Sequence, residues 1–216
     1  MEQSALQIPV GQPLTDDERL QLVSRARMLA SLGIAWHIVE AAIAFVAGAA
    51  AGSIALVGFG ADSLVETLAG LIVLWRFADR RAESETAEQR AQRLIGLSFF
   101  LVAGYVAVEA LRTLIAANHP DASWIGIGLA AVTLVTMPAL ASAKARVGER
   151  LESSATKSEG RQNLLCAYLS AGLLVGLSAN ALLSWWWADP ATALLIAGIA
   201  VHEGREVWRG EACEAC

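Results

Sequence analysis

The chain has 216 residues, of which 56% are hydrophobic and 17% charged, with a mean hydropathy of +0.50 and a formal net charge of −5. Soluble domains usually carry about 25% charged residues, so this composition indicates a membrane protein and excludes a disordered chain. The negative charge gives no basic surface for nucleic acid, and three cysteines give no disulfide framework. The length allows about five to seven membrane-spanning helices, and we expect no separate soluble domain beside them.

Six apolar stretches are each close to the roughly 20 residues that are needed to cross a bilayer. They are residues 28–50, 54–77, 94–117, 122–143, 163–187 and 190–208. The sixth has the shortest apolar part, because the polar run 202–206 follows it. Residues 1–27 lack the features of a signal peptide. We therefore expect an N-terminal segment (1–27), a six-helix transmembrane domain (28–208) and a short tail (209–216).

Basic residues predict how these helices are oriented. Of the 16 Lys and Arg residues, 15 lie on one side of the predicted membrane, and Arg112 lies within the third helix. The positive-inside rule then places both termini and the loops 78–93 and 144–162 in the cytoplasm. The predicted fold class is an all-α membrane protein with six transmembrane helices and both termini cytoplasmic. The expected location is the cell (inner or plasma) membrane.

Two acidic residues, Asp62 and Glu66, lie deep in the second stretch. A charge at that depth costs at least ~2.5–3.5 kcal/mol, so each residue needs an explanation. Their i,i+4 spacing places them on one helical face, about 6 Å apart. Two carboxylates this close cannot both stay ionised alone, so the pair is expected to hold a proton or to bind a divalent cation. A protonated, purely structural pair is the alternative.

Two further polar pairs lie in predicted helices at helical spacing. Cys166 and Ser170 occupy the fifth stretch four residues apart. A membrane-helix cysteine is usually a small hydrophobe, and a serine usually bonds to its own helix, so both have an ordinary structural interpretation. His37 and Glu40 lie at mid-depth in the first stretch. They are predicted either to pair with each other or to face the second helix as a proton relay.

The remaining polar groups have simpler interpretations. Glu109 and Arg112 have opposite charges at i,i+3 and predict an ion pair within the third helix. His202 and Glu203 fall near the cytoplasmic end of the sixth helix, where long side chains reach the interface. The two thiols in residues 213–216 are too few for a four-ligand zinc site and are interpreted as part of a flexible tail.

The passage 52–66, Gly-Ser-Ile-Ala-Leu-Val-Gly-Phe-Gly-Ala-Asp-Ser-Leu-Val-Glu, resembles the second membrane helix of the cation diffusion facilitator (cation efflux) family. Residues 165–170 and the Trp-Ala-Asp-Pro turn at 187–190 look like its fifth helix and the turn into its sixth. The resemblance covers residues 28–208. It implies a six-helix bundle that exchanges a divalent metal, most often zinc, for protons.

The resemblance also implies a metal site between the second and fifth helices, where Asp62 and Glu66 match the acidic pair of the family. The fifth-helix positions, usually His or Asp and then Asp, hold Cys166 and Ser170 here. The expected cargo is Zn²⁺, with Cd²⁺, Fe²⁺ and Mn²⁺ as alternatives and no permanently bound cofactor.

The cytoplasmic domain and His-rich loop common in the family have no counterpart in these residues. The expectation is therefore a short relative that consists of the membrane domain. A homodimer is expected to form through small-residue helix faces such as those of Gly48, Gly52 and Gly60.

Three functions stay open at this point. The first is a metal/proton antiporter that exports a divalent cation across the lipid bilayer. The second is a proton-coupled transporter or pore for another solute, with the acidic pair as a proton relay. The third is a membrane scaffold with a structural acidic pair. An enzyme is not expected, because the sequence has no recognisable set of nucleophile and base and no cofactor motif.

Overall fold

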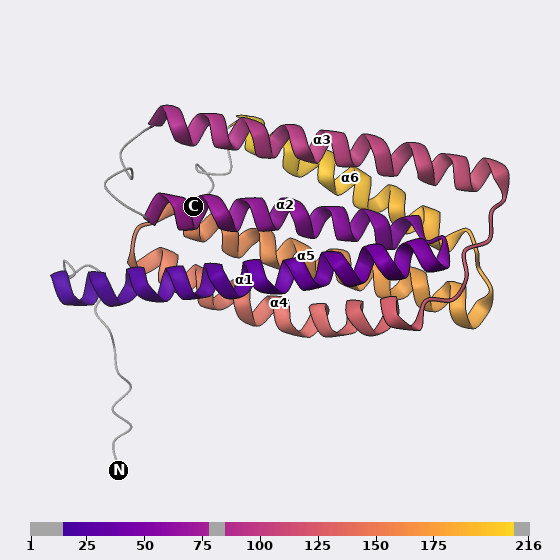
Figure 1. The fold of residues 1–216 in the computed structure, drawn as a ribbon, viewed down its shortest axis with the longest axis horizontal. Coiled ribbons are helices and arrows are strands. Elements are labelled where there is room, and N and C mark those ends of the chain that lie inside the picture. Colours follow the sequence, from indigo (N-terminus) through magenta and orange to yellow (C-terminus); the bar gives the residue numbers. More distant parts are fainter. Residues whose placement is uncertain (1–14, 78–84, 210–216) are drawn as a thin grey trace, which may run out of the picture.

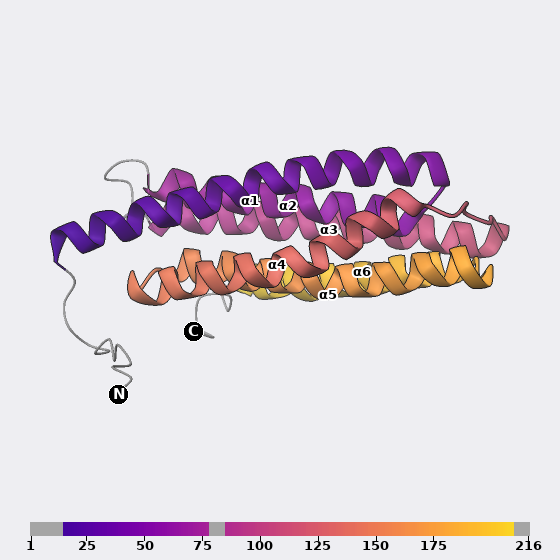
Figure 2. The same cartoon turned by 90° about the horizontal axis from the view of Figure 1, so that it is seen from below.

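The computed structural model describes residues 15–77 and 85–209, and within these ranges the chain forms six helices and no strand (Figures 1 and 2). The helices are α1 (Asp16–Ala51), α2 (Ile54–Phe77), α3 (Glu85–Ala116), α4 (Trp124–Arg150), α5 (Ser154–Leu183) and α6 (Ala188–Arg209). They run up and down along one elongated bundle. The predicted all-α class is confirmed.

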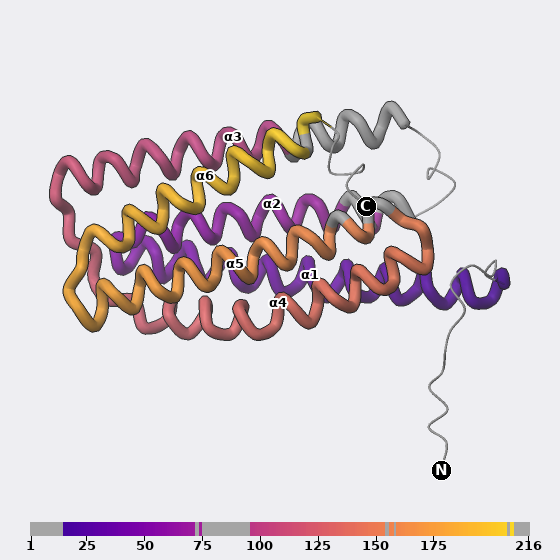
Figure 3. Tube along the Cα trace, turned by 180° about the vertical axis from the view of Figure 1, so that it is seen from behind, coloured from indigo at the N-terminus to yellow at the C-terminus, as the bar shows by residue number. Residues whose placement is uncertain are grey.

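Five helices, α1 to α5, contain a segment long and apolar enough to cross a membrane. The sixth predicted span is present as the 22-residue helix α6, which packs along α3 (Figure 3). Its composition is more polar, because His202, Glu203, Arg205 and Glu206 lie within its last third. The protein is an integral, multi-pass membrane protein.

Several helices extend beyond the predicted apolar stretches. The first helix begins at Asp16, not at residue 28, and Thr15 caps it in a capping box with Glu18. The fourth helix continues to Arg150 and the fifth begins at Ser154, so most of the predicted 144–162 loop is helical. Hydropathy detects only the part of a helix that lies in hydrocarbon, whereas capping residues support the polar turns beyond it.

The two ends of the bundle differ in charge. The first helix begins and α6 ends at the same end of the bundle, to the left in Figure 1. We call it the basic end, because every described Lys and Arg except Arg112 lies in the helix portions or the turn nearest to it. We call the other end the opposite end. The predicted tail at 213–216 and residues 78–84 of the first predicted loop lie outside the described residues.

At the opposite end, Asp189 connects α6 to the start of α2. Its fully buried carboxylate accepts hydrogen bonds from the Ser53 hydroxyl and from the backbone amides of Ile54 (3.1 Å) and Ala55 (3.4 Å). The Ser53 oxygen in turn accepts a hydrogen bond from the amide of Leu56 (3.2 Å). The first amides of a helix have no partner within the helix, so a residue 135 positions away completes the cap of α2.

Two of the three glycines predicted to form a dimer face pack inside the chain. A Cβ at Gly48 would lie 3.0 Å from Val57 Cγ2, and one at Gly60 would lie 3.1 Å from Ala44 Cβ. Both glycines therefore allow α1 and α2 to approach closely. Gly52 ends α1 in the left-handed conformation (φ 64°), which glycine adopts without strain. Gly48 and Gly60 therefore pack against a neighbouring helix of the same chain, and the expected homodimer stays a prediction.

Candidate metal site

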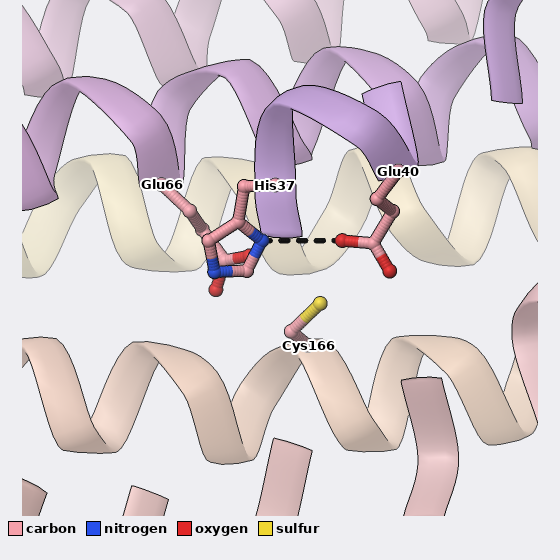
Figure 4. A group of neighbouring side chains, drawn as sticks. All are labelled: His37, Glu40, Glu66 and Cys166. Carbon is pink, nitrogen blue, oxygen red and sulfur yellow. Dashed lines mark hydrogen bonds and ion pairs between the residues drawn. The ribbon is translucent and has the colours of Figure 1, made fainter. Parts of the chain in front are cut away.

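Four buried side chains from three helices meet in the middle of the bundle (Figure 4). They are His37 and Glu40 of α1, Glu66 of α2 and Cys166 of α5, and each offers one ligand atom within 4.8 Å of the others. None is more than 6% exposed. We call this group the central cluster. It brings an imidazole, two carboxylates and a thiol together away from water.

His37 connects the members of the central cluster. Its Nδ1 lies 3.1 Å from Oε2 of Glu40 and 3.1 Å from Oε2 of Glu66. On its other side, Nε2 lies 3.0 Å from the side-chain amide nitrogen of Asn163. An amide nitrogen can only donate, so Nε2 is the acceptor and Nδ1 carries the proton that is donated to Glu40.

Glu40 accepts hydrogen bonds from three different helices. The His37 ring donates to Oε2, as does the Ser63 hydroxyl of α2 at 3.0 Å, and the Thr133 hydroxyl of α4 donates to Oε1. This side chain is fully buried, so the donors replace the water that a carboxylate would otherwise bind. Glu40 therefore fixes the relative position of α1, α2 and α4.

Glu66 differs from Glu40, because its Oε2 is buried and has no hydrogen-bond partner among the described residues. The nearby Nδ1 of His37 is bonded to Glu40 (dashed line in Figure 4) and is not aligned for Glu66. Nearly all buried polar atoms have a partner, and an unsatisfied one often marks a functional group or an ion site. The free oxygen of Glu66 is therefore available as a metal ligand.

The structure brings together two of the four predicted ligands, Glu66 and Cys166, and adds His37 and Glu40 to them. Asp62 is also buried but lies outside the central cluster, and it lines a cleft that Glu66 lines as well. The Ser170 hydroxyl donates to the backbone carbonyl of Cys166 (2.7 Å), which is the ordinary behaviour of a serine in a helix. The pairing of His37 with Glu40 and the ion pair of Glu109 with Arg112 (2.6 Å) are both confirmed.

Three polar partners of the central cluster were missed from the sequence: Ser63, Thr133 and Asn163. Asn163 lies three residues before Cys166, so helical spacing alone could have placed it on the same face of α5. Its amide also donates toward the Met137 sulfur (3.3 Å), while its own oxygen is buried without a partner. Thr133 gives no comparable signal, because its role depends on how α4 is rotated against α1.

Apolar helices around a buried set of potential metal ligands define a membrane transport domain. Residues 30–210 match the cation efflux transmembrane domain, and the chain belongs to this family of cation transporters, which are not enzymes. The resemblance to cation diffusion facilitators is thus confirmed.

Two relatives match most of this chain at low identity. An uncharacterized transporter (sll1263) of Synechocystis sp. is 26% identical over 85% of this chain and 62% of its own length. Transmembrane protein 163 of Xenopus laevis is 24% identical over 83% of this chain and 65% of its own length. The chain thus spans less than two thirds of the length of either relative.

Proposed function

We propose that the protein exports divalent metal ions, with zinc as the expected cargo, in exchange for protons. The central cluster is the observation that carries this proposal, because four potential ligands lie within 4.8 Å of one another in a buried position. Zinc is bound tetrahedrally by imidazole, thiolate and carboxylate groups, all of which the cluster supplies. A thiol disfavours Mg²⁺ and Ca²⁺, which prefer sites made of oxygen ligands.

Glu66 and Cys166 belong both to the ligand set expected from the sequence and to the central cluster. We propose these two residues as the constant ligands. His37 and Glu40 lie close enough to complete the site, once the proton on Nδ1 of His37 has moved away. Asp62 and Ser170, one turn beyond Glu66 and Cys166 toward the opposite end, are the proposed alternative ligands in a second conformation.

Proton exchange follows from the chemistry of these ligands. A thiol must lose its proton to bind a metal, and carboxylates that hold a proton must release it. Export of a doubly charged ion against an inside-negative potential costs ~4.6 kcal/mol per 100 mV, at ~2.3 kcal/mol per charge. Protons that enter as the metal leaves offset this cost. The direction, the cell-membrane location and the cytoplasmic position of the basic end belong to the same proposal.

The test is transport by the purified chain in proteoliposomes that contain a pH dye, with zinc, cadmium, iron(II) and manganese each added in turn. Antiport predicts proton movement that depends on the metal. A proton relay for another solute predicts pH changes without metal, and a scaffold predicts neither.

Variants link that transport to the site. Glu66→Ala should abolish metal uptake, whereas Glu66→Gln and Asp62→Asn should keep the shape of the site but lose proton coupling. Glu109→Gln, which removes a carboxylate on the outer face of α3, is the matched control and should transport normally. Full zinc transport by Glu66→Ala would contradict the proposal.

A further inference from the structure

A cleft extends from the neighbourhood of the central cluster toward the basic end, between α2, α3, α5 and α6. It is narrow and partly open, and three carboxylates line it. Asp62 and Glu66 lie at its buried part, and Glu203 of α6 is the lining carboxylate nearest the basic end. Its walls are otherwise mostly apolar, so the carboxylates are the groups in it that attract a cation.

Glu203 belongs to a second group of possible ligands, which we call the α6 triad. It consists of His202, Glu203 and Glu206, each of which offers one atom within 4.8 Å of the others. The Nε2 atom of His202 lies 3.3 Å from Oε1 of Glu206. The ring of His202 is 69% exposed, so the triad is accessible from outside the bundle. Arg161 contacts Glu206 at 3.6 Å and leaves its other carboxylate oxygen beside the histidine.

Exposed acidic groups are common, so the triad needs a second observation, and Asp62 provides it. This side chain is 8% exposed and lines the same cleft as Glu203. It makes no hydrogen bond or ion pair with any residue in the described ranges. A carboxylate buried without a partner is costly unless a ligand or proton compensates it. Oε2 of Glu66, which lines the same cleft, is buried and has no hydrogen-bond partner among the described residues. The buried part of the cleft therefore offers an entering cation carboxylate oxygens that no other described side chain occupies.

The other approach from the basic end, between α1, α2, α4 and α5, contains a buried ion pair. Lys144 of α4 and Glu159 of α5 form a buried ion pair there, with 2.5 Å between Nζ and Oε1. A Cβ at Gly33 of α1 would lie 2.8 Å from that Nζ, and one at Gly70 of α2 would lie 3.3 Å from that Oε1. Both glycines are one helical turn from the central cluster on the basic-end side. Passage of an ion this way would require Lys144 and Glu159 to separate.

We propose that the α6 triad is a second, peripheral site for divalent metal, from which the ion passes along the cleft to the carboxylates of Asp62 and Glu66. One imidazole and two carboxylates suit zinc and cobalt(II). Binding at the triad stands by itself, whereas the transfer from the triad to Glu66 rests on the proposed function.

The binding test uses the full chain with Cys213→Ser and Cys216→Ser, which removes the thiols of the tail as competing ligands. Equilibrium dialysis against zinc, followed by elemental analysis, should give two ions per chain. The double variant His202→Gln/Glu206→Gln should lose one ion, Glu66→Ala should lose the other, and the combined variant should bind none. The control Glu149→Gln removes an exposed carboxylate at the same end of the bundle and should keep both ions.

The triad residues are at least partly exposed, so their replacement should leave the fold intact, which circular dichroism and elution volume would check. In proteoliposomes, the double variant should raise the KM for zinc about tenfold with little change in the maximal rate, because the ligands at the centre remain. Retention of two zinc ions by the folded double variant would overturn the peripheral site. Loss of one ion without any zinc transport by the wild type would support the site and contradict the proposed function.

Discussion

Lys144 and Glu159 form an ion pair inside the bundle, with both side chains almost fully buried. The second oxygen of Glu159 is also buried and has no hydrogen-bond partner among the described residues. Burial of two charges is compensated only by their mutual attraction and by their hydrogen bonds. Each member of this pair therefore depends on the other.

Removal of one partner should destabilise the protein far more than removal of both. Lys144→Met leaves an unpaired buried carboxylate and should cost about 3–5 kcal/mol. The double replacement Lys144→Met/Glu159→Met substitutes packing for the charges and should cost much less. Thermal unfolding in detergent would compare the three proteins. Equal stability of the single and double variants would show that the two charges are not coupled.

Asn163 should control the metal affinity of the central cluster through His37. For Nδ1 of His37 to bind a metal, its proton must move to Nε2, which then needs an acceptor such as the unpartnered oxygen of Asn163. Asn163→Leu should therefore weaken zinc binding about 10- to 100-fold, whereas Asn163→Asp should largely restore it. Isothermal titration with zinc measures this.

The matched control for Asn163 is Asn180→Ala. Asn180 is another buried asparagine of α5, and its amide donates to the Pro120 carbonyl (2.9 Å) at the opposite end of the bundle. Its replacement should lower stability but keep the zinc affinity. Equal affinity of Asn163→Leu and the wild type would assign Asn163 a packing role.

Cys166 should determine which metals are preferred. Cys166→Ser removes the soft ligand, so zinc and cadmium transport should fall strongly while manganese changes less. Cys166→His should recover part of the zinc rate, and Ser170→Ala should cost much less than Cys166→Ser. Initial transport rates at fixed pH give the ranking. An unchanged ranking in Cys166→Ser would leave the thiol as a core residue, as its place among the buried apolar side chains also allows.

The basic end should face the cytoplasm. Single cysteines introduced at two exposed positions, Ala122→Cys at the opposite end and Glu149→Cys at the basic end, test this in a background with Cys213→Ser and Cys216→Ser. Cys166 is buried and should not react. A membrane-impermeant reagent added to cells should label position 122, and position 149 only after the cells are opened. The reverse pattern would invert the topology.

Gly176 should be needed for the contact between α5 and α6. A Cβ there would overlap the Thr192 hydroxyl and lie 3.0 Å from Thr192 Cβ and 3.3 Å from the Ala188 carbonyl oxygen. Gly176→Ala should therefore lower the unfolding temperature. The control is Gly198→Ala in α6, where a Cβ would meet nothing within 4 Å, and a gain in helix propensity is expected. Equal effects of the two changes would argue against close packing at Gly176.

The helix positions were largely predictable because membrane spans have a strong composition signal. The second helix has the predicted bounds, Ile54–Phe77, since Gly52 and Ser53 separate it clearly from α1. The polar start of α1 was not recognised, although Thr15 and Glu18 carry the Thr-x-x-Glu pattern of a capping box. Hydropathy does not detect these first polar turns of α1, because they are stable in water and need no apolar residues.

The candidate site was predictable only in part. Their spacing placed Asp62 and Glu66 on one helical face. The free-energy cost of burying a carboxylate in the membrane then indicated a functional role for both residues. The position of His37 beside Glu66, and not merely beside Glu40, depends on which faces α1 and α2 turn to each other. That rotation is set by close glycine contacts such as Gly60 against Ala44. A single sequence does not show directly which faces of two helices contact each other.

The cap that Asp189 places on α2 has a consequence for biosynthesis. A ribosome makes about 5–20 residues per second, so the 135 residues between Ile54 and Asp189 take on the order of 10 s. Throughout that interval the Ser53 hydroxyl and the first amides of α2 lack the acceptor that finally binds them. The cap of α2 can therefore be completed only after Asp189 has been synthesised, and a shorter nascent chain would hold these donors without their native acceptor.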